Sequence, residues 1–406
     1  MKRMILVIIT VISILIFLTG CWNRRELNQL AIVVGIGIDK VDDQFLVTTQ
    51  VINPGQIATQ KSSIEKAPVI MYQETGDTVF EAIRKITTTA PRKMYASHLR
   101  MIVLGEEFAK DGIGEILDLL FRDQEFRMDF YIMVAEGMRA EDILKVSTPL
   151  EKIPSNKMFN ALETSQKEWS ATKAVTLHEL VKTIVREGEA LVLTGITVKG
   201  DKDLATNSMD NLERTVPNGD LQITNLAVFN KDKLIGWLDE MEGKTYNVLT
   251  NNEKSTTINL SCPQGGKVVY EVKNSSTDMK AEIRKGKPEI DLNVFVEGDI
   301  AEVQCDMDLT KEGTIEEIEK IYEKEAKSYF RNAISQIQQH HEADIFGFGE
   351  EIHRANPEIW RKIKGDWNEQ FKYLPVNIKV QGEIKQIGTV ENSVLEKLEK
   401  QREMDK

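Results

Sequence analysis

Hydrophobic positions in the first half of the chain alternate between strand-like and helix-like spacing. Apolar runs over residues 32–38 and 45–52 predict two strands. Thr78, with Glu81 three positions later, predicts a capping box at the start of a helix whose apolar face would carry Phe80, Ile83 and Ile86. Later runs predict strands over 99–104 and 130–134 and helices over 113–120, 141–146, 157–168 and 176–187. This alternation predicts an N-terminal mixed α/β domain over residues 21–190 that includes a short tether at its start.

The spacing changes after residue 190. A strand over 191–198 leads through a polar segment to two short apolar runs, 226–229 and 233–237. Three polar residues separate those runs, which predicts a hairpin, and residues 238–246 follow with a helical pattern. We expect a small middle domain over residues 191–254.

The last third of the chain is a series of short alternating segments. Apolar alternation with intervening turns predicts strands over 256–262, 268–272, 279–284 and 290–296, and hence an antiparallel sheet. Thr314 and Glu317 predict a second capping box that opens a helix of about 27 residues. Its apolar stripe would cover the open face of the sheet. A closing strand over 376–387 completes a C-terminal domain over 255–390, before a charged tail over 391–406. The predicted fold class is α+β, with three mixed α/β domains.

The N-terminus has the three parts of an export signal. Lys2 and Arg3 precede an almost unbroken apolar run over residues 4–18, and small residues follow it. The alternative is an uncleaved transmembrane helix. That run is only about 15 residues long, whereas a spanning helix needs about 20, so the pattern favours a cleaved signal.

The end of this signal is more specific. Leu18, Thr19, Gly20 and Cys21 match a bacterial lipobox, in which small residues admit the peptidase and the cysteine thiol carries a diacylglyceryl thioether. We therefore expect residues 1–20 to be a cleaved lipoprotein signal peptide. Cys21 would become the S-diacylglycerol and N-acyl cysteine at the new N-terminus. Two or more acyl chains anchor a protein stably to a bilayer, whereas one chain binds only marginally.

The net charge of the chain limits the kinds of partner that it can bind. The chain carries a formal charge of −12, which becomes −14 when the signal with its two basic residues is removed. An acidic protein has no electrostatic basis for binding nucleic acid or for lying flat on anionic lipid. The predicted membrane contact is therefore the lipid on Cys21.

Cys262 and Cys305 are the other cysteines, and each lies on the apolar side of an alternating segment. We expect two buried thiols that pack as small hydrophobic groups. A disulfide between them stays open, because an exported protein can form one and because the sequence cannot show whether they are close.

Signatures of catalysis are incomplete. Gly243-Lys244-Thr245 resembles the end of a phosphate loop, but Leu238 stands where the loop needs a glycine. Gly35 and Gly37 lie inside a strand pattern without the third glycine of a dinucleotide site. These departures predict no nucleotide cofactor and no enzyme activity.

Two segments contain residue types that bind metal ions. Asp306, Asp308, Thr310 and Glu317 have the spacing of a calcium loop, but Lys311 replaces its glycine. His340, His341 and His353 form a histidine-rich segment, yet adjacent histidines on a helix point about 100° apart. We expect no metal at either place.

Several short segments together resemble the Ger(x)C family of spore germination lipoproteins. They are Cys21 to Leu27, Ala31-Ile32, Gly35 to Asp39, Ile52 to Gly55, Arg84-Lys85, Arg92-Lys93, Tyr95-Ala96, His98, Leu104 to Glu106, and Val228-Phe229 to Leu238. The resemblance covers nearly the whole mature chain, although Asn23 stands where many members carry Asp.

The resemblance implies the C subunit of a nutrient germinant receptor, lipid-anchored through Cys21 to the outer face of the spore inner membrane. It also implies three α+β domains and non-catalytic action together with the A and B integral-membrane subunits. Two other classes stay open: a solute-binding lipoprotein of a transporter, which would show two similar lobes, and an envelope hydrolase, which the missing motifs disfavour.

Overall fold

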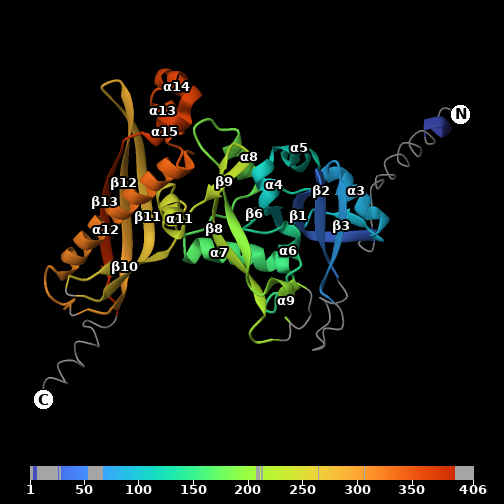
Figure 1. Ribbon diagram of the computed structural model, residues 1–406, viewed down its shortest axis with the longest axis horizontal. Helices are drawn as coiled ribbons and strands as arrows, with labels where there is room; N and C mark the ends of the chain where they lie inside the picture. Colours follow the sequence, from blue (N-terminus) through green and yellow to red (C-terminus); the bar gives the residue numbers. More distant parts are fainter. Residues whose placement is uncertain are drawn as a thin grey trace, which may run out of the picture.

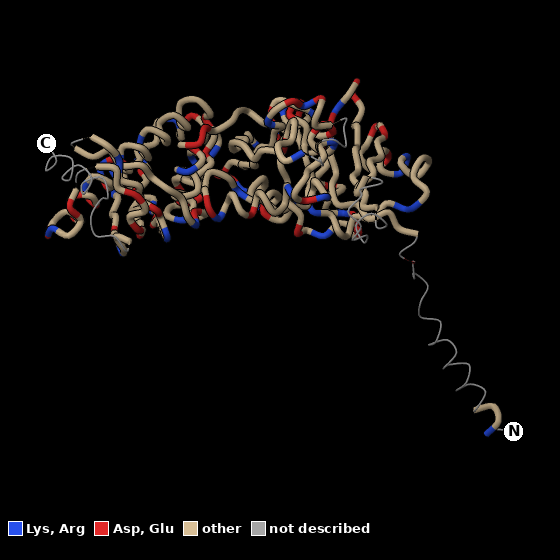
Figure 2. The backbone as a smooth tube through the Cα atoms, turned by 90° about the horizontal axis from the view of Figure 1, so that it is seen from below, with Lys and Arg blue, Asp and Glu red and all other residues tan. Residues whose placement is uncertain are grey.

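The structure is a computed structural model that describes residues 3–6, 26, 29–53, 67–206, 211, 214–263, 265–305 and 307–388. The described chain is elongated, with a nine-stranded sheet towards one end and a four-stranded sheet towards the other (Figure 1). Acidic and basic residues are interspersed along its length (Figure 2).

The larger sheet has the strand order β3-β2-β1-β5-β6-β7-β8-β9, with β4 paired to β1. Its strands are β1 (Leu30–Val41), β2 (Gln44–Ile52), β3 (Val69–Gly76), β4 (Lys93–Tyr95), β5 (Met101–Gly105), β6 (Tyr131–Ala135), β7 (Val192–Gly200), β8 (Gly219–Asn230) and β9 (Lys233–Trp237). The central strands β1, β5, β6 and β7 run parallel, and antiparallel strands flank them. Every residue of β5 is buried, which explains its continuous apolar run.

Helices cover both faces of this sheet. They are α3 (Val79–Lys85), α4 (Glu106–Asp111), α5 (Gly114–Arg122), α6 (Ala140–Leu144), α7 (Pro154–Glu168), α8 (Leu177–Ile184) and α9 (Lys202–Thr206). Residues of α3, α4, α5 and α8 pack in one hydrophobic core, and residues of α6 and α7 pack in a second. The mixed α/β character predicted for this region is confirmed.

The strands predicted within residues 21–190 are confirmed with bounds shifted by a few residues, but β3, β4 and α4 in this part of the chain were missed. The edge strand β3 has only one fully buried residue, Gly76, so it carries no clear apolar alternation. Strand β4 is three residues long and too short to produce a pattern.

The segment predicted as a middle domain, 191–254, contributes β7, β8 and β9 to this same sheet. The predicted hairpin is confirmed: β8 pairs antiparallel with β9, and Lys231 in its turn has a positive φ of 56°. Helix α11 (Glu240–Leu249) follows. These strands have no sheet of their own. The bounds of the middle domain, 191–254, stay a prediction.

The second sheet has the order β10-β11-β12-β13. Its strands are β10 (Thr256–Ser261), β11 (Lys267–Arg284), β12 (Lys287–Val303) and β13 (Val376–Gln386). The prediction of separate strands over 268–272 and 279–284 is wrong, because both belong to β11. Irregular pairing around Val272 and Asn274 interrupts the alternation that the sequence showed. Strand β13 pairs parallel to β12, since a helical connection carries the chain back across the sheet before β13 begins.

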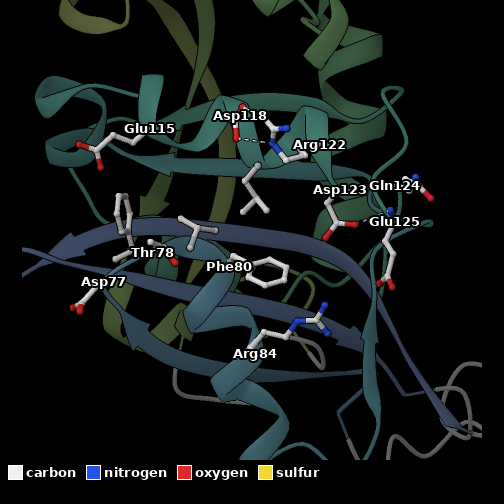
Figure 3. Close-up of a pocket in the computed structure, with 13 residues that line it drawn as sticks. Asp77, Thr78, Phe80, Arg84, Glu115, Asp118, Arg122, Asp123, Gln124 and Glu125 are labelled. Carbon is white, nitrogen blue, oxygen red and sulfur yellow. Dashed lines mark hydrogen bonds and ion pairs between the residues drawn. The ribbon is translucent and has the colours of Figure 1, made fainter.

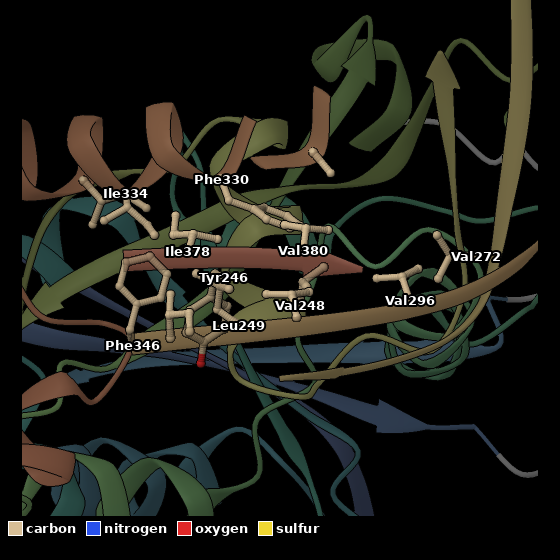
Figure 4. Packing of buried hydrophobic residues seen from close by; sticks show 14 of the residues in the cluster. Tyr246, Val248, Leu249, Val272, Val296, Phe330, Ile334, Phe346, Ile378 and Val380 are labelled. Carbon is tan, nitrogen blue, oxygen red and sulfur yellow. The ribbon is translucent and has the colours of Figure 1, made fainter. Parts of the chain in front are cut away.

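Helix α12 (Thr314–Gln336) covers this sheet, with Phe330 and Ile334 over Ile378 and Val380 (Figure 4). The predicted capping box at its start is wrong. Gly313, with φ 89°, is the N-cap, and Thr314 is already the first helical residue. A π-helical turn, Ile337–His341, extends the helix, and α13 (Phe348–Ala355), α14 (Pro357–Ile363) and α15 (Trp367–Lys372) follow.

Asp344 stands where the two parts of the molecule meet. Its backbone carbonyl accepts a hydrogen bond from Ala190 N at 2.7 Å, which joins the segment before β7 to the segment before α13. Its carboxylate accepts from the backbone N–H groups of Phe346, Gly347, Phe348 and Gly349 and from Trp367 Nε1, at 2.7–3.2 Å. Burial raises the pKa of this carboxyl to about 7, although the backbone donors oppose the rise. These hydrogen bonds hold the segment before β7 and the start of α13 in contact.

Cys262 and Cys305 form a disulfide with a Cα–Cα distance of 6.4 Å. Both residues are buried in the C-terminal core, as expected. The expectation of free thiols is wrong, because the turn between β10 and β11 brings Cys262 beside the end of β12. The bridge joins positions 43 residues apart.

Candidate functional site

The predicted lipidation site lies outside the described residues. This applies to Cys21 and to Leu18, Thr19 and Gly20, as it does to the tail over 391–406. Among the described helices, none combines the length and apolar character needed to cross a bilayer.

The near-miss nucleotide motifs have structural roles. Gly243, Lys244 and Thr245 lie inside α11 rather than in a loop. A Cβ on Gly35 would stand 2.1 Å from Ser155 Oγ, and one on Gly37 would stand 3.0 Å from the Leu144 side chain. These two glycines therefore allow α6 and α7 to approach β1 closely.

Asp39 completes this contact. Its carboxylate accepts from the backbone N–H groups of Ala140 and Glu141 at 2.8 and 3.0 Å, and so caps α6 from the neighbouring strand. Burial raises the pKa of Asp39, and the two backbone donors oppose the rise. The segment Gly35 to Asp39 is thus a packing motif.

The histidines do not converge. His340 and His341 lie in the π-helical turn, whereas His353 lies in α13 and stacks on Trp360 with ring centroids 6.0 Å apart. Over the described ranges, no group of three or more His, Cys, Asp or Glu side chains is placed to hold a metal ion.

A cleft of about 750 Å³ lies between α3, α5 and the segment after α5 (Figure 3). We call it the α3–α5 cleft. It is lined by Phe45, Asp77, Thr78, Val79, Phe80, Arg84, Glu115, Asp118, Leu119, Arg122, Asp123, Gln124 and Glu125. Acidic side chains outnumber the two arginines along its walls. The cleft therefore favours a partner with basic and apolar groups.

Thr78 and Phe80 set the wall formed by α3. Thr78 Oγ1 accepts from Glu81 N at 3.1 Å, which confirms one half of the predicted capping box, whereas the Glu81 carboxylate accepts from the backbone N–H of the residue before Thr78 rather than from Thr78 N. Of the predicted apolar face, Ile86 is buried and Ile83 packs against the core, but the assignment of Phe80 is wrong, because this side chain is 43% exposed. Phe80 thus presents an aromatic surface at the cleft.

The charged groups of the cleft are held in place by neighbours. The Arg84 guanidinium lies 4.7 Å from the centroid of the Phe80 ring. Across the cleft, Arg122 binds both carboxylate oxygens of Asp118 at 2.7 and 3.0 Å, and this pairing lowers the pKa of Asp118 (Figure 3). An exposed aromatic group within a charged rim is typical of a protein-contact surface.

The cleft lies near the start of the large sheet. Leu30, the first residue of β1, is in register with Lys93 of β4. The Lys93 ammonium forms an ion pair with Glu125 on the cleft wall. The first residue of β1 therefore lies beside this surface.

Comparison with known proteins shows to which family the chain belongs. The family described as "Spore germination protein N-terminal domain" matches residues 23–198, and "Spore germination B3/GerAC like, C-terminal" matches residues 224–388. Spore germination protein KC of Bacillus subtilis (strain 168) is 32% identical over 97% of this chain and 98% of its own length. The chain belongs to this family of spore germination proteins.

Other spore germination proteins are similar over most of the chain. Spore germination protein B3 of Bacillus subtilis (strain 168) is 25% identical over 93% of this chain and 96% of its own length. A solved structure titled "Crystal Structure of the GerBC protein" has a TM-score of 0.53 at 20% identity, and the match covers 86% of this chain and 96% of that one. The family assignment and the α+β fold are confirmed.

The sequence did not predict the α3–α5 cleft, although Arg84 and Lys93 belong to the segments that carry the family resemblance. Nothing in the sequence indicated that the Phe80 side chain lies at the surface. A phenylalanine in a helix is usually assigned to the buried face, and only the packing of α3 on the sheet places this one at the surface.

Proposed function

We propose that this protein is the lipid-anchored C subunit of a spore germinant receptor, needed for the response to nutrients that trigger germination. The observation that carries the proposal is the similarity to spore germination protein KC over nearly the whole length of both chains. The lipobox ending at Cys21 supports an anchor on the outer face of the spore inner membrane.

The short tether explains how weak contacts with membrane proteins are enough for the chain to act with them. About nine residues separate Cys21 from β1, and they reach at most about 30 Å. The large sheet is therefore confined near the bilayer, where its effective concentration towards membrane proteins is high. The A and B integral-membrane subunits are the proposed partners.

The α3–α5 cleft is the proposed contact surface for those subunits. It lies beside the start of β1 and presents the exposed Phe80 ring within a charged rim. The mode of action is contact without catalysis. One hydroxyl of the cleft, Thr78 Oγ1, already accepts a helix-capping hydrogen bond, as expected of a structural residue.

The role of the anchor can be tested with a Cys21→Ala variant in spores that lack the native gene. We expect the variant to leave the membrane fraction and to reduce the nutrient response towards that of the deletion strain. Full germination by a variant that does not fractionate with membranes would refute the tethering step. An unchanged nutrient response in the deletion strain, with related receptor genes also removed, would refute the receptor role.

The contact surface needs a separate pair of variants. Phe80→Asp places a charge in the cleft, and Ile70→Asp places the same charge on β3 at an equally exposed position, 43% in both cases. We expect the first variant to lose co-purification with the A and B subunits and the second to retain it. Equal behaviour of the two variants would exclude the cleft as the contact.

The transporter alternative finds less support in the fold. A solute-binding lipoprotein would have two similar α/β lobes. The two sheets described here differ in strand number, in strand order and in the helices that cover them.

A further inference from the structure

A second cavity, of about 230 Å³, lies between α11, α12 and the strands β10 and β11. It is smaller than the α3–α5 cleft and lies in the C-terminal part of the chain. Its walls include the aromatic side chains of Tyr322, Tyr329 and Phe330 from α12. Its size and aromatic lining suit a small organic molecule.

Glu253 brings a carboxylate to this cavity. The residue is 6% exposed and follows α11, and its backbone N–H donates to Asn247 O at 3.1 Å, which fixes its position. Within the described part of the chain, Glu253 Oε2 and Ser275 Oγ are both buried without a hydrogen bond of good geometry, and Ser275 is close enough to stabilise the Glu253 carboxylate. Buried polar atoms are normally paired, so a carboxylate oxygen at a cavity wall without a well-formed hydrogen bond leaves room for a further donor.

A basic residue, Lys244, lines the cavity and is already engaged with other groups. Lys244, on α11, forms an ion pair with Glu240 at 3.0 Å, and its ammonium lies 3.6 Å from the centroid of the Trp169 ring. No described residue forms an ion pair with Glu253 within 4.0 Å. The cavity therefore combines aromatic rings with an acidic group that forms no direct ion pair with a described residue, and Lys244 acts on this acid only at longer range.

We propose that this cavity binds a small organic cation, a primary or quaternary ammonium compound with a short apolar part, through Glu253, Tyr322 and Tyr329. An ammonium group supplies the missing positive charge, and a primary ammonium also supplies an N–H donor. Aromatic faces attract such cations, and the apolar part displaces water from the remaining wall. This inference does not depend on the proposed receptor role.

The electrostatics give the site a pH dependence. Burial raises the pKa of Glu253, whereas Ser275 and Lys244 oppose the rise. Lys244 faces it from α11, Ser275 from β11, and Glu325 and the two tyrosines from α12. Burial keeps both tyrosines neutral to high pH, so binding should strengthen as pH rises and Glu253 ionises.

Calorimetric titration of the full chain in a nonionic detergent tests the proposal. The probes are n-butylammonium, tetramethylammonium and neutral n-butanol. We expect at least one cation to bind about tenfold more tightly than n-butanol, and its affinity to rise with pH. No binding by either cation up to about 50 mM, or equal binding of cation and alcohol, would overturn the proposal.

Variants locate the site. Glu253→Gln keeps the shape but removes the charge and should weaken cation binding at least about tenfold, and Tyr329→Leu should weaken it several-fold. Glu316→Gln is the control, because Glu316 is an exposed acid on α12, the helix that carries Tyr329, and does not line the cavity. Cation binding that survives Glu253→Gln in a variant with wild-type circular dichroism would also overturn the proposal.

Discussion

Replacing Asp344 with alanine tests whether its carboxylate holds the junction between the two parts of the protein. The side chain accepts five hydrogen bonds, four from backbone N–H groups around the start of α13 and one from the Trp367 indole. Alanine would leave those donors unpaired in a buried place. The substitution also removes the cap-like anchor of the helix.

The expected loss follows from these contacts. Leaving one buried donor unpaired costs about 1–3 kcal/mol, and partial relaxation of the structure limits the sum. We expect Asp344→Ala to lower the free energy of unfolding by about 3–5 kcal/mol, as for other broken buried networks. Asp344→Asn should cost about 2–3 kcal/mol, because its oxygen can serve Phe346, Gly347 and Phe348 while its NH₂ faces Gly349 and Trp367.

Urea denaturation followed by tryptophan fluorescence measures these differences. Asp366→Ala is the control, since Asp366 is exposed, precedes α15 and makes no side-chain cap bond there. Hydrogen exchange should also show α13 amides losing protection while β1 amides retain it. A loss below about 0.5 kcal/mol for Asp344→Ala, or one equal to the control, would refute the reasoning.

Three further outcomes are expected. Burial raises the pKa of Asp344 to about 7, so as pH rises the carboxyl group loses its proton in the unfolded chain before it does so in the folded protein. The free energy of unfolding should therefore fall by up to about 4 kcal/mol as pH rises from about 4 to 7. Asp344→Asn should abolish this fall, and a variant with the wild-type pH profile would contradict the prediction. Gly35→Ala should destabilise the protein by about 1–3 kcal/mol in urea denaturation because its Cβ would meet Ser155 Oγ, whereas Gly365→Ala, with open space around it, should not; equal losses would count against the packing role. Replacing Cys262 and Cys305 together by alanine should lower the free energy of unfolding by about 2–4 kcal/mol, and a double variant as stable as the wild type would show that the bridge does not stabilise the fold.

Local patterns were enough for much of the secondary structure. The continuous apolar runs of β1 and β5 and the cap of α3 depend on residues that are neighbours in the sequence. The same is true of the hairpin at Lys231. Such features follow from side-chain periodicity and turn chemistry, which need no knowledge of distant contacts.

Contacts between distant segments could not be predicted in this way. The sequence placed Cys262 and Cys305 in the core but could not pair them, because their separation depends on the register of β10, β11 and β12. The parallel pairing of β13 depends on the helical crossover in front of it. The exposure of Phe80 likewise depends on how α3 packs.

The sequence by itself therefore determined the family, the lipobox at Cys21 and the alternation of strands and helices, because these are encoded in short, contiguous segments. Only the tertiary structure decided the continuity of the large sheet across residue 190, the disulfide, the α3–α5 cleft and the cavity around Glu253. Each of these brings together groups from separate elements. Their distances follow from chain closure and packing, which no local pattern contains.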